Sequence, residues 1–283
     1  MAVRRAGIAH RVTAWGGTKS LKQAIQSGVV DGIESSFDEG EVSEADLVYL
    51  SAPIGGILDF LQTRGWLIKP GAIVTDAGST KREICRIALQ NLPPTVHFVG
   101  GHPMAGSHQA GVEFARPDLF EGAPYAVIPN GRAERATLAV VEIANAIGAR
   151  PVMIEAEQHD RIVARTSHAP QLLSTALAVV AAKSVEKDTP CIAGRGFADM
   201  TRLAESPWSI WKDICRTNAD EIAVALGEVL AEIDMARRAL AAGDDSHLQR
   251  AFEAANKLSA LGEPEEGGAQ SSPPSSNVRK RQP

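Results

Sequence analysis

The stretch "ADLVYLSAPIGGILDFLQTRGWLIKPGAIVTDAGSTKREICRIALQNL", residues 45–92, decides the fold. It holds two short apolar runs, "ADLVYLSAP" and "GAIVTDAGS", and each is followed by a segment with helical apolar spacing. Runs of Val, Ile and Leu without polar alternation are typical of strands buried on both faces, as in a parallel sheet covered by helices. The stretch therefore predicts βαβ units and an α/β domain.

The same alternation continues on both sides of this stretch. It is preceded by "HRVTAW" and "SLKQAIQSG", and it is followed by "VHFVGGHP", "APYAVIP", the helix-like "AERATLAVVEIANAIGA" and the strand candidate "RPVMIE". From Glu157 onward the β signal disappears, and long segments such as "ADEIAVALGEVLAEIDMARRALAAGD" have helical spacing. We predict an α/β domain over residues 1–155, an all-helical domain over 156–262 and, because Pro, Gly, Ser and charge fill residues 263–283, a disordered tail.

Composition narrows the class of protein. A length of 283 residues suits two domains, and 44% hydrophobic with 22% charged residues is ordinary for a globular protein. A net charge of -5 gives no electrostatic reason to expect nucleic acid, so a small molecule is the favoured partner. No apolar run approaches the ~20 residues that span a bilayer, and no secretory signal is visible. The three cysteines form no CxxC pair, which predicts a cytoplasmic protein without structural zinc.

Several catalytic signatures are missing from the sequence. No G-x-S-x-G motif surrounds Ser79 or Ser107, no HExxH occurs, and "GGTKS" departs from a phosphate loop because Thr18 separates glycine from lysine. Hydrolase and NTPase functions are therefore poorly supported. The remaining candidates are polar clusters at the ends of predicted strands, where open α/β sheets bind ligands.

Two of these clusters lie in the α/β half. "TDAGSTK", residues 75–81, places Ser79 near the start of a helix, either as its N-cap or as a ligand-binding hydroxyl. "VGGHPMAGSHQAGVE", residues 99–113, holds His102 between glycines and a proline, either as a presented side chain or as a solvated turn residue.

Two more clusters lie in the helical half. In "RTSHAPQLLS", Pro170 interrupts a helical pattern beside His168, which either faces solvent at a kink or lines a site. In "GFADMTRLAESPWSIWKDICRTN", Arg202 lies between helices, as a surface ion-pair partner or as a ligand-binding group.

Taken in order, "TDAGSTK", "GGHPMAGSHQAGVE", "SHAPQLLS" and "TRLAESPWSIWKDI" resemble the prephenate dehydrogenase family of tyrosine biosynthesis, which includes arogenate and cyclohexadienyl dehydrogenases. The resemblance runs from about Val12 to Leu261, and its most specific part is the HPMAG block next to DxGSxK. It implies a Rossmann-like N-terminal domain, an all-helical C-terminal dimerisation domain that forms a homodimer, and an active site between the two domains. It also implies an NAD(P)-dependent enzyme.

The family reaction oxidises the C4 alcohol of prephenate by hydride transfer to a nicotinamide. The ring carboxylate leaves as carbon dioxide, which gives 4-hydroxyphenylpyruvate from prephenate or tyrosine from arogenate. By resemblance, His102 is the base for the hydroxyl proton, Ser79 orients the reacting centres, and Arg202 holds a substrate carboxylate with its planar fork. The resemblance further places His168, Gln171 and Ser107 in the substrate pocket, and Ser51, Pro53, Gly78 and Ser79 beside the cofactor.

Three positions depart from the family pattern. Gln171 stands where the family often has a second histidine in "SHxPH", which leaves prephenate and arogenate open as substrates. His108 replaces the acid that often follows HPxAGT, so no gating role is carried over to it. No acidic residue ends the predicted second strand and Lys19 lies just beyond it, which makes NADP at least as plausible as NAD.

The family pattern begins with a strand and a G-x-G-x-x-G turn that receives the cofactor pyrophosphate, and this sequence shows neither. "MAVRRAGIAHRV" resembles the end of the first helix entering the second strand, so the Rossmann-like domain is predicted to be incomplete. We expect the in-frame DNA upstream of Met1 to encode the strand and the turn. The alternative is a catalytically silent ligand-binding remnant of the family that lost its cofactor loop.

Overall fold

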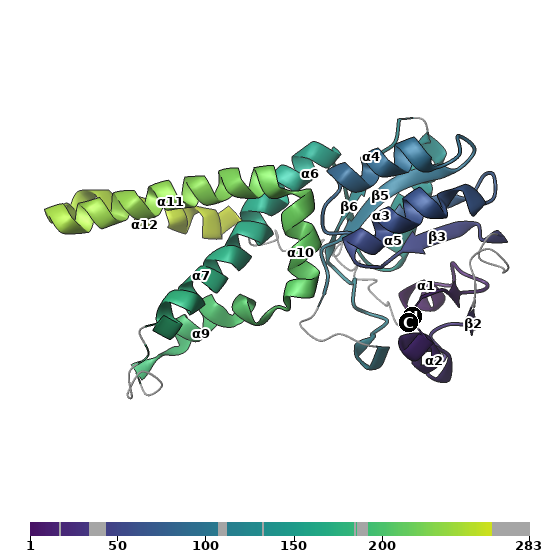
Figure 1. The fold of residues 1–283 in the computed structure, drawn as a ribbon, viewed down its shortest axis with the longest axis horizontal. Coiled ribbons are helices and arrows are strands. Elements are labelled where there is room, and N and C mark those ends of the chain that lie inside the picture. The colour runs from purple at the N-terminus through teal and green to yellow at the C-terminus, as the bar shows by residue number, and fades with distance from the viewer. Residues whose placement is uncertain are drawn as a thin grey trace, which may run out of the picture. The chain divides into compact units, whose positions relative to one another are not determined.

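The computed structural model describes residues 1–16, 18–33, 44–106, 112–131, 133–183, 185 and 192–261 (Figure 1). The chain divides into two compact units, residues 1–226 and 227–283. Three earlier predictions fall outside the described part: the role of Ser107, the state of the tail from residue 263, and the side chain of Lys19. The domain boundary at residue 155 stays a prediction.

The first unit contains a five-stranded sheet in the order β3-β4-β5-β6-β7. Its strands are β3 (Leu47–Leu50), β4 (Ile73–Asp76), β5 (His97–Pro103), β6 (Pro124–Ile128) and β7 (Arg150–Met153). β3, β4 and β5 are parallel, with Leu50 opposite Asp76 and Thr75 opposite Val99. The apolar runs of the sequence therefore predicted the core of the sheet correctly.

Two strands, β6 and β7, run against the predicted direction. β6 is antiparallel to β5, with Gly101 opposite Val127, and β7 is parallel to β6. A parallel neighbour needs a crossover connection, usually through a helix. The described residues between β5 and β6 contain only a short 3-10 helix, η3 (Val112–Phe114), so no crossover helix is present in this part of the connection.

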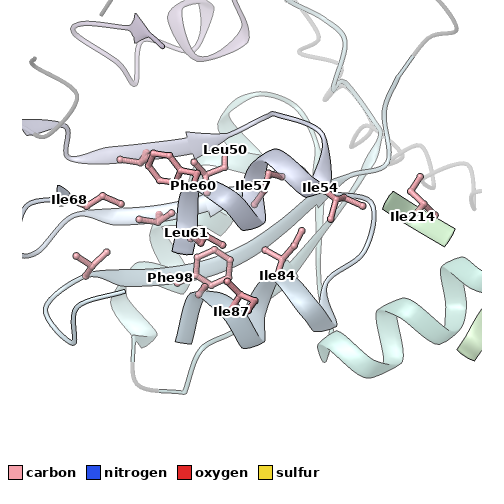
Figure 2. Close-up of a cluster of buried hydrophobic side chains, with 14 of the residues drawn as sticks. Leu50, Ile54, Ile57, Phe60, Leu61, Ile68, Ile84, Ile87, Phe98 and Ile214 are labelled. Atoms are coloured by element: carbon pink, nitrogen blue, oxygen red, sulfur yellow. The ribbon is translucent and has the colours of Figure 1, made fainter. Parts of the chain in front are cut away.

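Helices cover both faces of the sheet, as predicted. α3 (Ile54–Thr63), with η2 (Gly65–Leu67) after it, and α4 (Arg82–Asn91) lie over one face, and α5 (Glu134–Ala146) lies over the other. Because adjacent strand residues point to opposite faces, Phe98 joins the core that Ile57, Leu61 and Ile84 form beneath α3 and α4 (Figure 2). Its neighbour Val99 joins the core beneath α5. This arrangement confirms the Rossmann-like α/β prediction.

The beginning of the chain forms a separate pair of strands. It contains α1 (Ala2–Arg5), β1 (Thr13–Ala14), α2 (Thr18–Gln26) and β2 (Gly32–Ile33). β1 and β2 are parallel, with Thr13 opposite Gly32. The sequence analysis predicted β1 and α2 but missed β2, since two residues give no readable alternation.

The described residues after β7 contain only helices and their connections. These helices are α6 (Ala156–Val163), the π-helical turn η4 (Ala164–His168), α7 (Ala169–Lys183), α9 (Arg195–Thr201), η5 (Arg202–Glu205), α10 (Trp208–Thr217), α11 (Ala219–Ala242) and α12 (Asp245–Leu261). The helical half is thus confirmed. None of the described helices has the length and apolar content to cross a bilayer.

Pro170 does not end the helix that contains it. The N–H of Ala169 donates to the carbonyl of Ala164, which makes the turn before the proline a π-helical turn. A wide turn at this point accommodates a residue that has no N–H to donate and whose ring crowds the preceding turn. The predicted interruption is therefore a local widening of one continuous helix.

Candidate active site

The predicted site residues of the α/β half gather at one edge of the sheet. Ser51 and Pro53 follow β3 and are exposed, and Gly78 and Ser79 follow β4. His102 is the penultimate residue of β5. Because these three strands are parallel, their carboxyl ends meet at the same edge, which is where open α/β sheets bind ligands.

A buried ion pair organises the loop after β4. Asp76 and Lys81 are completely buried and form a salt bridge with each other. The Lys81 ammonium also donates to the carbonyl of Gly101 at 2.6 Å, and the Asp76 carboxylate accepts the N–H of Gly78 at 2.8 Å and of Gly101 at 3.1 Å. The additional hydrogen bonds offset the cost of removing both charges from water. The loop is thereby fixed against the strand that ends with His102.

Gly101 precedes His102 because the sheet leaves no room for a side chain there. A Cβ at this position would lie 2.5 Å from the carbonyl oxygen of Asp76, and 2.9 Å from both the Thr75 and the Tyr125 hydroxyl oxygens. The glycine therefore permits close packing of β5, and its backbone is not at a positive φ. His102 is consequently placed by a strand end, not by a solvated turn.

Ser79 does not cap the helix that follows it. The N-cap of α4 is Lys81, and the Asp160 carboxylate from α6 accepts the N–H of Lys81 at 2.7 Å and of Arg82 at 2.9 Å. A carboxylate at this end also interacts favourably with the helix dipole. The half-buried Ser79 hydroxyl makes no hydrogen bond with the residues that the structure describes. It is therefore available to a ligand.

His102 contacts a second histidine that the sequence analysis did not select. Its Nδ1 lies 2.9 Å from Nε2 of His159, and the two rings meet edge to face at 5.1 Å. Nδ1 of His159 lies 2.8 Å from a carboxylate oxygen of Asp160, and both residues are buried in α6. The adjacent His–Asp pair in "EQHDRIV" was the available signal, but it lies outside the motifs of the family pattern.

Burial lowers the pKa of His102 well below its ordinary value of 6.5. The positive charge of Lys81 and the neighbouring rings of His159 and His168 act in the same direction. The half-buried imidazole is therefore neutral at physiological pH and can accept a proton.

His168 is buried in η4 and does not face solvent. The amide nitrogen of Asn218 lies 3.3 Å from its Nδ1 and also donates to the carbonyl of Asp160 at 2.8 Å. The ring of Trp211 packs edge to face at 5.9 Å. Burial lowers the pKa of His168 to about 4, against the opposing effect of the Asp160 charge. Asn218 thus joins His168 to the same polar network as His102.

Gln171 forms a hydrogen bond with the backbone next to Arg202. Gln171 is buried in α7, and its side-chain nitrogen donates to the carbonyl of Leu203 at 2.7 Å. The hydroxyl of Ser174 accepts the N–H of Ala204 at 3.1 Å, so α7 holds η5 at two points. Arg202, the first residue of η5, is exposed and forms no ion pair within the described part of the chain. The alternative of a surface ion pair is therefore not realised there.

A cavity of about 580 Å³ lies between α3, α4 and α10. Its lining includes Gly55, Arg82, Asp213 and Arg216, and it includes none of the histidines of the network. The histidine network therefore does not line this cavity.

The sheet, the polar residues at its carboxyl edge and the following helices define the class of dinucleotide-binding α/β proteins with a helical second domain. More particularly, the chain belongs to the prephenate dehydrogenase family. Residues 1–153 match the family described as "Prephenate dehydrogenase, nucleotide-binding domain", and residues 155–254 match "Prephenate dehydrogenase, dimerization domain". The resemblance inferred from the motifs is confirmed.

Individual relatives agree with this assignment. The chain is 35% identical over 239 residues to prephenate dehydrogenase of Bacillus subtilis, covering 82% of this chain and 63% of that protein. It is 29% identical to cyclohexadienyl dehydrogenase of Zymomonas mobilis, covering 82% of this chain and 79% of the relative. The crystal structure of Aquifex aeolicus prephenate dehydrogenase with hydroxyphenyl propionate and NAD+ superposes with a TM-score of 0.83 at 24% identity, covering 92% of each chain.

Proposed function

We propose that the protein catalyses the oxidative decarboxylation of prephenate or arogenate with NAD or NADP, as a step of tyrosine biosynthesis. The observation that carries the proposal is a neutral histidine, His102, at the same carboxyl edge of the sheet as the available hydroxyl of Ser79. Membership of the prephenate dehydrogenase family supports it. The chain spans 63% of the length of the Bacillus subtilis relative.

The residues at the sheet edge suit a nicotinamide cofactor. Ser51 and Pro53 are exposed at the end of β3, and the half-buried Ser79 offers a hydroxyl without a charge. When bound there, the nicotinamide ring accepts a hydride. The relative from Aquifex aeolicus was crystallised with NAD+. Trp15 and Gly16 directly follow β1, so no acidic side chain disfavours a 2'-phosphate at that strand end, and we propose that NADP is accepted as well as NAD.

The chain's own residues handle the proton and the substrate charge. As hydride leaves C4, the hydroxyl proton passes to the neutral imidazole of His102, and a base of this kind contributes roughly 10²–10⁴-fold. Ser79 orients the same hydroxyl. His168 is neutral at physiological pH, so Arg202 supplies the positive fork for a substrate carboxylate. Gln171, which stands near Arg202, supports that segment through its bond to Leu203.

Substrate and cofactor are tested together by following nicotinamide reduction with prephenate and arogenate, each with NAD and with NADP. We expect turnover with at least one pair and its loss in His102→Asn. Absence of reduction in all four mixtures would contradict the proposal. The intact network around His102 gives no support to a catalytically silent remnant.

We also propose a homodimer formed through the C-terminal helices. The second family match is to a dimerization domain, and residues 227–261 expose large apolar side chains. These are Leu230, Ile233, Met235, Leu240 and Phe252.

Cys85 and Cys215 are free thiols, which supports our further proposal that the protein is cytoplasmic.

A further inference from the structure

We propose that His159 is a positioning residue that fixes the tautomer of His102, and that Asp160 fixes the tautomer of His159 in turn. The inference rests on the proposed function, in which His102 is the base. The geometry points to it through two hydrogen bonds in series: His102 Nδ1 to His159 Nε2 at 2.9 Å, and His159 Nδ1 to Asp160 Oδ1 at 2.8 Å.

The direction of both hydrogen bonds follows from the carboxylate. An ionised carboxylate only accepts hydrogen bonds, so Nδ1 of His159 must carry the hydrogen. A neutral imidazole carries one hydrogen, so Nε2 of His159 is left as an acceptor for Nδ1–H of His102. Nε2 of His102 then holds the lone pair that receives the substrate proton. The arrangement follows the logic of a base whose tautomer is held by a third group.

The network also receives the charge that the reaction creates. When the substrate hydroxyl gives its proton to Nε2 of His102, the Nδ1 proton of His102 can shift to Nε2 of His159. The positive charge then lies beside the Asp160 carboxylate. After product release that proton shifts back to Nδ1 of His102, and the proton taken from the substrate leaves Nε2 of His102 to solvent, so the protein regains its starting protonation.

Among the described residues, the charges of Lys81, the N-cap of α4, and of His168 in η4 act on His102, and His159 contacts Asp160 of its own helix. Lys81 forms an ion pair with Asp76 from β4. His159 is 3% exposed, so bulk water does not provide its hydrogen bonds.

A substitution of His159 distinguishes the positioning role from a structural role better than a substitution of Asp160. Asp160 also accepts the N–H groups of Lys81 and Arg82 at the start of α4, so its loss disturbs the helix as well as the network. The ring nitrogens of His159 bond only His102 and Asp160 within the described residues. His159→Phe keeps an aromatic ring and removes both of these bonds.

The tautomer is read directly by nitrogen NMR of the full chain labelled at its histidines, with His102→Asn used to assign the His102 signals. Near neutral pH we expect His102 to carry its proton on Nδ1 in the parent, and to lose this single tautomer in His159→Phe. His247→Asn, a substitution in α12, is the control and should leave the His102 signals unchanged. A parent His102 protonated on Nε2 would overturn the proposal, whether or not His159→Phe folds.

Kinetics give the second readout. We expect His159→Phe to lower kcat on the order of 10²-fold and to change KM less than about threefold, because the loss falls on the proton-transfer step. A folded His159→Phe with kcat within about threefold of the parent would refute the positioning role and leave the proposed function standing. If the parent oxidises neither substrate, the proposed function fails and the NMR result still decides the tautomer.

Discussion

At the scale of single residues, protonation states decide what the site can do. Burial, Lys81 and two neighbouring histidines all disfavour the charged form of His102. A base must be unprotonated to act, and its pKa lies well below 6.5, so the acid limb of the rate profile moves to lower pH. The proposed site therefore combines an uncharged base with a positive group, Arg202, for a substrate carboxylate.

This state predicts the pH dependence of catalysis. We expect kcat/KM to stay on its plateau as the pH falls through 6.5, the ordinary histidine value, and to decline only at clearly lower pH. Initial rates measured across the acid range at limiting substrate test this. A half-maximal point at or above pH 6.5 would contradict the proposal that His102 is a base with a lowered pKa.

His168 predicts a pH dependence of stability. Its pKa is about 4 in the folded chain and 6.5 when unfolded, so the unfolded state binds the extra proton between these values. Stability from this group is complete above pH 6.5, falls as the pH drops, and is lost by about pH 4. The shift corresponds to about 3 kcal/mol. Between pH 6.5 and 4, the free energy of unfolding measured in urea should fall by roughly this much more in the parent than in His168→Gln. An equal fall in both proteins would contradict the prediction.

At the scale of elements, the sheet edge depends on strand pairing and on close packing between residues that are distant in the sequence. The apolar runs predicted β3, β4 and β5 because buried parallel strands have continuous apolar character. The antiparallel direction of β6 and the pairing of β1 with β2 were not predictable, since they are set by connections and partners distant in sequence. For the same reason "GG" before His102 was readable only as permissive backbone, whereas the structure shows tight packing at Gly101.

Gly101→Ala tests that packing. The new Cβ would lie 2.5 Å from a backbone oxygen of Asp76, which can move only if the strands shift. We expect destabilisation of about 1–3 kcal/mol or more, measured by denaturant unfolding. Gly131→Ala is the matched control, because a Cβ there meets nothing within 4 Å and the residue has no positive φ. Equal stability of the two variants would contradict the packing account.

The contact between α7 and η5 predicts a kinetic effect. In Gln171→Leu the carbonyl of Leu203 loses its buried partner, and the segment that begins with Arg202 loosens. We expect KM to rise at least about fivefold while kcat changes less than about threefold. Arg202→Lys, which replaces a planar fork with a point charge, should raise KM in the same way. Steady-state kinetics of both variants measure these changes. A KM that rises in Arg202→Lys but not in Gln171→Leu would contradict the supporting role of Gln171.

At the scale of the whole molecule, local motifs predicted more than long-range contacts. The four motifs identified the family, and the loss of the β signal from Glu157 onward predicted the helical half. The contact between His102 and His159 joins residues 57 positions apart, and no local pattern reports such a distance. The same limit applies to Asn218, which joins His168 to Asp160 across two helices.

The proposed homodimer predicts that the C-terminal helices hold two copies of the chain together. Leu230 and Phe252 are 61% and 73% exposed in the single chain, and burying such side chains at an interface supplies its main driving force. We expect the parent to be dimeric at micromolar concentration by light scattering, and Leu230→Glu combined with Phe252→Glu to weaken the dimer at least about 100-fold. Leu138→Glu is the matched control, because Leu138 is 53% exposed on α5, outside the C-terminal helices. A monomeric parent, or equal dissociation of the control, would contradict assembly through these helices.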